Sequence, residues 1–64
     1  MKTCECKKEF DVIDLEKTHT IKKGDKIKVI RAYDKGLYVY MECEFNGIIF
    51  DLESHFFDTR IKKA

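Results

Sequence analysis

In residues 37–45, apolar side chains at the odd positions alternate strictly with tyrosines and glutamates at the even positions. Asn46-Gly47 follows directly, and a second, mostly apolar run comes after it at residues 48–52. Alternation with a period of two predicts a β-strand with one buried face. Asn-Gly favours a two-residue hairpin turn, because both central positions of a type I′ turn need positive φ. The sequence therefore predicts a β-hairpin, and this hairpin constrains the fold more than any other feature.

The two-residue turn also fixes which residues of the hairpin face each other. It places on one apolar face the pairs Phe45 with Ile48, Cys43 with Phe50, and Met41 with Leu52. On the other face it places Glu42 beside Asp51, an unfavourable pair of like charges.

A preceding strand is predicted over residues 26–33, joined through Asp34-Lys35-Gly36 as a three-residue turn with a bulge. That register pairs Val29 with Met41 and Ile27 with Cys43, which extends the apolar face. It also sets Lys28 against Glu42 and Lys26 against Glu44. The two hairpins together predict a three-stranded meander with a coherent core.

The ends of the chain carry weaker patterns. Residues 9–15 read as a strand or extended segment that covers the sheet through Phe10, Val12 and Leu15. Residues 54–57 read as one 3₁₀ or helical turn with Ser54 as its N-cap, and residues 59–62 as a last strand with Ile61 inward. We expect one domain over residues 1–64, with a flexible N-terminus over 1–8 and a barrel over 9–62.

Length and composition narrow the functional classes. With 64 residues and a net charge of +1, the chain is too short for a two-domain enzyme and too neutral for a polybasic nucleic-acid binder. No apolar run approaches the ~18 residues of a membrane span, and the first 15 residues lack the apolar core of a secretory signal. Lysine outnumbers arginine 11 to 2, which indicates an AT-rich genome. We expect a bacteriophage, mobile-element or bacterial protein in the cytoplasm of a bacterial cell or infected host.

The order of these elements resembles the small SH3-like barrels. The resemblance covers about residues 20–62 and is carried by residues 21–29 (IKKGDKIKV), by Asn46-Gly47, and by residues 53–57 before the final strand. It implies a mostly β, five-stranded barrel or meander with one short 3₁₀ or helical turn. Such barrels bind proteins or nucleic acids and rarely catalyse. Since the chain has no Trp and no Pro, recognition of polyproline is not implied.

The face opposite the predicted core carries the main functional hypothesis. Aromatic and apolar residues, including Ile30, Ala32 and Ile49, lie there within a rim of acids, as in a protein interface. We expect a non-catalytic protein-binding module without a cofactor, acting as an inhibitor or adaptor of a host complex. Its binding residues are predicted to be Tyr38, Tyr40, Glu42, Glu44, Asp51 and Glu53.

The first alternative is a nucleic-acid-binding barrel. Residues 20–35 carry six basic and two acidic side chains, with Lys22, Lys23, Arg31 and Lys35 as candidate phosphate contacts. Tyrosines would supply stacking platforms. Residues 42–58 carry five acids and no base, which opposes this alternative.

The second alternative is a zinc-stabilised module, because Cys4 and Cys6 supply two thiolates. Cys43 would be the third ligand and His19 or His55 the fourth. The predicted register opposes this site by placing Cys43 in the core. The two N-terminal cysteines would otherwise be ordinary thiols. Finally, a domain this small gains stability by burying its outer tyrosines in a homodimer, which is therefore another candidate assembly.

Overall fold

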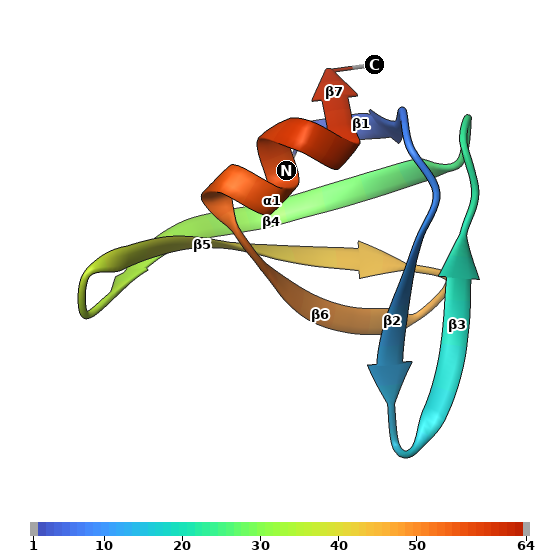
Figure 1. Cartoon of the computed structure of the whole chain (residues 1–64), viewed down its shortest axis with the longest axis horizontal. Helices are drawn as coiled ribbons and strands as arrows, with labels where there is room; N and C mark the ends of the chain where they lie inside the picture. The colour runs from blue at the N-terminus through green and yellow to red at the C-terminus, as the bar shows by residue number, and fades with distance from the viewer. Residues whose placement is uncertain (1, 64) are drawn as a thin grey trace.

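The computed structural model describes the backbone of residues 2–63 and the side chains of residues 2–61, and it is mostly β-structure, as expected (Figure 1). Seven strands are present in this part of the chain rather than the five expected, with one short helix. The elements are β1 (Lys2–Cys6), β2 (Phe10–Asp14), β3 (Lys17–Ile21), β4 (Lys26–Lys35), β5 (Tyr38–Phe45), β6 (Ile48–Glu53), α1 (Ser54–Arg60) and β7 (Ile61–Lys63).

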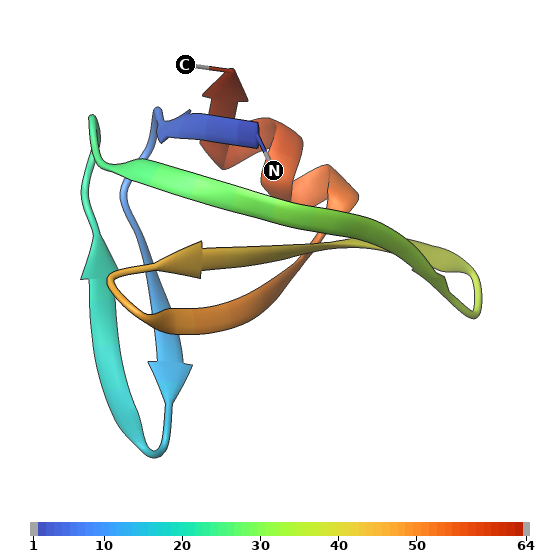
Figure 2. The same ribbon diagram turned by 180° about the vertical axis from the view of Figure 1, so that it is seen from behind.

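Five strands form one antiparallel sheet in the order β6-β5-β4-β1-β7, and β2 and β3 form a separate hairpin. The β2–β3 hairpin runs across the ends of β5 and β6, and α1 lies near the opposite end of β6 (Figures 1 and 2). The meander of β4, β5 and β6 is thus the centre of the fold, closed from both ends in a way compatible with a small barrel.

The hairpin of β5 and β6 has the predicted turn and the predicted register. Phe45 faces Ile48 and Cys43 faces Phe50. Asn46 and Gly47 have φ values of 50° and 82°, as a type I′ turn requires. The unfavourable neighbours Glu42 and Asp51 are also opposite each other.

The predicted register between β4 and β5 is wrong. The turn has two residues, Gly36 and Leu37, so Val29 faces Cys43 rather than Met41, and a β-bulge lies between Val29 and Arg31. Gly36 has a φ of 68°, which suits the first central position of a type II′ turn. From Arg31 onward, the side chains of β4 point to the opposite side of the sheet from the one predicted. The bulge adds one residue and so shifts the alternation by one.

This shift moves two groups of side chains. Ala32, expected on the outer face, is opposite Met41 and so shares the core face. Leu37 and Val39, expected in the core, are 95% and 40% exposed. They lie on the part of the β4–β5 hairpin that extends beyond the rest of the sheet (Figure 1), which we call the arm, residues 32–40.

The expected flexible N-terminus is wrong for the residues that the structure describes there. β1 lies inside the sheet, between β4 and β7. The Cys6 amide donates to the Asp25 carbonyl at 2.8 Å, and the Gly24 amide donates to the Cys6 carbonyl at 2.7 Å. The segment is ordered because both of its edges are paired and two of its side chains enter the core.

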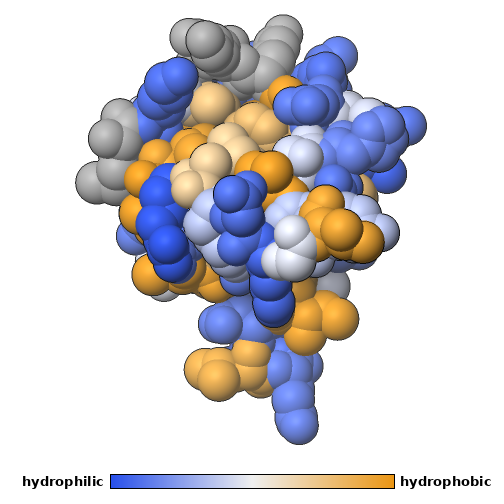
Figure 3. Space-filling view, turned by 90° about the vertical axis from the view of Figure 1, so that its left-hand side faces the viewer, coloured by the Kyte–Doolittle hydropathy of each residue, from blue (hydrophilic) through white to orange (hydrophobic). Residues whose placement is uncertain are grey.

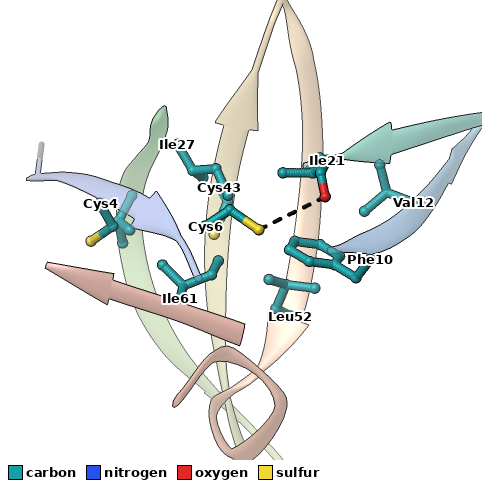
Figure 4. Packing of buried hydrophobic residues seen from close by; sticks show 10 residues of the cluster. Cys4, Cys6, Phe10, Val12, Ile21, Ile27, Cys43, Leu52 and Ile61 are labelled. Atoms are coloured by element: carbon teal, nitrogen blue, oxygen red, sulfur yellow. Dashed lines mark hydrogen bonds between the residues drawn. The ribbon is translucent and has the colours of Figure 1, made fainter. Parts of the chain in front are cut away.

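The core joins β1 to the meander and to the β2–β3 hairpin. Ile21, Ile27, Cys6 and Cys43 are completely buried, and the ring of Phe10 meets those of Phe50 and Phe56 edge-on at 6.4 and 5.5 Å. Figure 4 shows Cys6, Phe10, Ile21, Ile27 and Cys43 converging from separate elements. The remaining core residues are Cys4, Val12, Val29, Leu52 and Ile61.

Two expectations for the ends of elements are corrected. The helix extends over two turns rather than one, and its N-cap is Glu53 instead of Ser54, with the Glu53 carboxylate accepting the Phe56 amide at 3.3 Å. Leu15, expected to cover the sheet, lies in the β2–β3 turn and is 87% exposed. Leu15 and Glu16 form this turn with positive φ, 49° and 66°, so Leu15 lies at the tip of the hairpin, away from the sheet it was expected to cover.

Candidate functional site

The outer face of the meander is the face that turns away from the core. The β4–β5 register puts Tyr33 opposite Tyr40 and Arg31 opposite Glu42, and the β5–β6 register puts Asp51 opposite Glu42. Residues directly opposite in an antiparallel pair point to the same side. Together these residues form what we call the tyrosine face: Lys28, Arg31, Tyr33, Lys35, Tyr38, Tyr40, Glu42, Glu44, Ile49 and Asp51.

Two stacked rings form the centre of the tyrosine face. The centroids of Tyr33 and Tyr40 are 5.9 Å apart, with 25° between the ring planes. The guanidinium of Arg31 lies 4.7 Å from the centroid of Tyr33, and the ammonium of Lys35 lies 5.9 Å from that of Tyr40. Each ring thus carries a cation, an arrangement that holds the side chains in place while the rings remain partly exposed.

The acids expected to border this surface are largely neutralised. Arg31 Nε donates to Glu42 Oε1 at 3.0 Å, and Lys28 Nζ lies 3.9 Å from Glu44 Oε1. The predicted pair of Lys28 with Glu42 is wrong, since the register shift brings Arg31 to Glu42. Lys26, predicted to meet Glu44, instead donates to a carboxylate of β1, Glu5, at 2.9 Å.

Two predicted acids have different roles. Asp51 is exposed and lies beside Tyr33. Desolvation, followed by a hydrogen bond to this carboxylate, raises the pKa of the Tyr33 hydroxyl. Glu53 is committed to the N-terminus of α1. Five of the six residues predicted for protein binding therefore belong to the tyrosine face. Glu53 lies on the same side of the sheet, opposite Tyr40, but its carboxylate is bound to the N-terminus of α1.

The predicted nucleic-acid contacts do not converge. Lys22 and Lys23 lie in the turn before β4, whereas Lys35 is the last residue of this ten-residue strand. A strand of that length covers most of the longest extent of the molecule, which is 28 Å. Arg31, between them, is engaged by Glu42. These four cations form two separated groups instead of one phosphate-binding surface.

The predicted zinc ligands are directed into the core. Cys4 and Cys6 lie on the buried side of β1, and the Cys6 thiol donates to the Lys8 carbonyl at 3.2 Å. Burial raises the pKa of Cys43 to about 12, and it raises that of Cys6, which favours thiols over thiolates. Within the described residues, no three His, Cys, Asp or Glu side chains are grouped to hold a metal ion.

Sequence reasoning missed two adjoining hollows at the base of the arm, which we together call the apolar groove. One hollow of about 310 Å³ is lined by Lys2, Val29, Ile30, Arg31, Ala32 and Met41. A second, of about 220 Å³, shares Lys2, Val29 and Met41 with it and continues to Phe57 and Ile61. Figure 3 views the molecule from the end of the arm and shows apolar residues gathered between charged ones. No local pattern in the sequence could mark this groove, because it depends on where β1 pairs with β4.

Comparisons with protein-family models, curated proteins and solved structures gave no match. Among the described residues there is also no helix with the length and apolar character that a membrane crossing requires.

Proposed function

We propose that this protein is a non-catalytic module that binds another protein through the tyrosine face. The stacked pair of Tyr33 and Tyr40 is the observation that carries the proposal. Tyrosine and arginine are enriched at protein interfaces, where they offer large contact areas with few rotatable bonds. Here the stacking and the Arg31 contact already order the rings, which lowers the entropic cost of binding.

The chemistry of the face indicates the kind of partner. Tyr38 and Ile49 are each 58% exposed and offer apolar area on either side of the stacked pair. Asp51 has no ion pair with a described cation and is available to one from the partner. A partner that presents an apolar surface with a lysine or arginine fits this arrangement better than a phosphate backbone.

The same proposal includes the architectural and biological expectations from the sequence. A meander closed by a crossing hairpin, with a short helix before the last strand, supports an SH3-like barrel. The lysine-rich composition supports a phage, mobile-element or bacterial protein that acts in the cytoplasm as an inhibitor or adaptor of a host complex.

Affinity capture with matched variants tests the proposal. The bait is the tagged chain, the surface variant is Tyr40→Ala with Asp51→Lys, and the control is Thr18→Ala on the β2–β3 hairpin. Circular dichroism confirms that each variant is folded. A partner that wild type and control retain should be lost by the surface variant, and titration of the purified partner should show affinity reduced about tenfold or more. A purified partner that binds all three equally contradicts the assignment of this surface.

A further inference from the structure

β4 is longer than the strand that pairs with it on the side away from β5. β1 covers β4 only from Lys26 to Val29, whereas β5 pairs with it as far as Lys35. Residues 31–35 of β4 are therefore paired on one side only among the described residues. An extended strand in that position turns alternate N–H and C=O groups outward without partners.

The apolar groove lies beside this open edge. Its larger hollow, about 310 Å³, is lined by residues 29–32 of β4 and by Met41 of β5. Ala32 and Met41 are opposite each other on the core side of the sheet. Lys2, at the start of β1, also lines the hollow. A chain that continued the line of β1 along β4 would direct alternate side chains into this hollow, because strand side chains alternate between faces.

The charges along the same edge are mostly positive. Lys2, Arg31 and Lys35 lie on or next to it, and of these only Arg31 has an ion pair with a described carboxylate. Asp34, opposite Val39 on the core side, is the one acid among residues 31–35. On the outer side, a strand added here would have Arg31, Tyr33 and Lys35 as its cross-strand neighbours.

We propose that the open edge of β4 receives an extended segment of the partner protein by strand addition, and that this segment alternates acidic with apolar residues. Its acids lie on the outer side against Lys35 and against the guanidinium of Arg31, of which Nε is the group bound to Glu42, and its apolar residues enter the hollow beside Ala32. Main-chain hydrogen bonds supply affinity and the alternating side chains supply specificity. This inference rests on the proposed function, and it extends the contact from the tyrosine face around the edge of β4.

The bulge at Ile30 and the charges of Arg31 and Lys35 are also devices that protect edge strands from indiscriminate pairing. Protection and selective addition make different predictions. A purely protected edge refuses every extended peptide, whereas a selective one accepts a peptide of opposite charge.

The test uses the whole ¹⁵N-labelled protein and a synthetic, capped seven-residue peptide that alternates Glu with Val. Comparison peptides replace each Glu with Lys, or carry N-methyl groups along one edge. Chemical-shift changes and slowed hydrogen exchange should concentrate in residues 31–35. Affinity should fall about tenfold with N-methylation, which removes hydrogen bonds, and about fivefold or more with Lys.

A protein variant checks the hollow independently of the peptide chemistry. Ala32→Arg places a long charged side chain in the hollow and should weaken binding of the Glu-Val peptide about fivefold or more. Thr18→Arg, on an exposed strand of the other sheet, is the matched control and should bind as wild type does. Equal binding by both variants overturns the proposed position of the peptide.

The remaining outcomes are decisive too. Absence of shifts at millimolar peptide, or shifts confined to β6 (the other long edge), overturns the proposal. Concentration-dependent self-association that protects residues 31–35 without peptide shows that a second copy is the occupant, and also overturns it. If the peptide binds at β4 while Tyr40→Ala with Asp51→Lys leaves partner affinity unchanged, the strand-addition site survives and the tyrosine-face proposal fails.

Discussion

The rings of Tyr33 and Tyr40 stack across β4 and β5 because the β-bulge at Ile30 turns Tyr33 to the outer face. Without the extra residue, the alternation of β4 would direct Tyr33 to the core side of the arm, away from Tyr40. A backbone irregularity seven residues from the turn centre thus creates the aromatic centre of the candidate surface.

The hydroxyl of Tyr33 should titrate at a pKa above the ordinary tyrosine value, and Asp51→Asn should lower that pKa. Burial is the larger cause of the elevation and the Asp51 carboxylate the second, so the variant should remove part of the shift. Titration of the Tyr33 ring carbons by NMR, in wild type and in the variant, measures this. An unchanged Tyr33 titration in Asp51→Asn contradicts the contact.

Alkaline pH should destabilise the fold through Cys43. Its pKa is raised from 9.0 to about 12 in the folded chain, so its contribution is fully present below pH 9 and is lost as pH rises toward 12. The loss should be about 2 kcal/mol at pH 10.5. Urea unfolding between pH 8 and 10.5 should show a smaller decline for Cys43→Val than for wild type; parallel declines would assign the effect to other groups.

The three cysteines should resist alkylation in the folded protein. Cys4, Cys6 and Cys43 are at most 3% exposed, so a reagent reaches them only when the chain opens. Iodoacetamide should modify them about a thousandfold more slowly than a free thiol, for an opening free energy of about 4 kcal/mol. Urea should abolish the difference. Rapid modification of Cys4 and Cys6 alone would support the flexible N-terminus predicted from the sequence.

Substitutions in the β2–β3 turn should stabilise the fold. Leu15 and Glu16 have positive φ without being Gly or Asn, and left-handed geometry costs roughly 1 kcal/mol or more for such residues. Leu15→Asn with Glu16→Gly should therefore raise the free energy of unfolding by about 1–2 kcal/mol. The reverse exchange, Asn46→Leu with Gly47→Glu, should lower it. Unchanged stability in the first variant would show that the native turn is not strained.

Binding to single-stranded DNA should be weak and only mildly dependent on salt. The cations split into the group of Lys22 and Lys23 and the distant Lys35. Two or three phosphate contacts give a slope of log affinity against log salt of about −2. Fluorescence anisotropy with oligothymidine measures the slope. A value much steeper than this, reduced by Lys35→Glu as well as by Lys22→Glu, would favour the nucleic-acid alternative.

Local turn chemistry made the β5–β6 hairpin predictable, because Asn-Gly permits one loop length and hence one register. The β4–β5 hairpin lacked such a signal, since Gly36 fits both a three-residue loop with a bulge and a type II′ turn. Before the bulge, the predicted β4–β5 register differs from the observed one by two residues. A shift by an even number keeps Ile27 and Val29 on the predicted side of the sheet. Beyond Ile30 the faces were reversed, and the apolar alternation of the arm was mistaken for core.

The place of β1 was not predictable from local pattern. Cys4 and Cys6 alternate with charged residues, but the partners that bury them lie over twenty residues away on β4 and at the far end of the described chain on β7. The candidate surface was partly predictable because Tyr38, Tyr40, Glu42, Glu44 and Asp51 depend on the hairpin that was registered correctly. Tyr33 depends on the bulge, and the role of Glu53 depends on where α1 begins.

The pairing of Cys4 with Lys63 and of Cys6 with Ile61 gives the fold a demanding order of assembly. These pairs join residues at opposite ends of the described chain, so they are the most non-local contacts of the sheet, and such contacts form only after loop entropy has been lost. During synthesis, the meander and the β2–β3 hairpin are available early, while β1 has a free edge until β7 has emerged from the ribosome. The nascent chain consequently passes through a stage with an unsealed sheet, in which chaperones or a binding partner can reach a strand that the finished protein conceals.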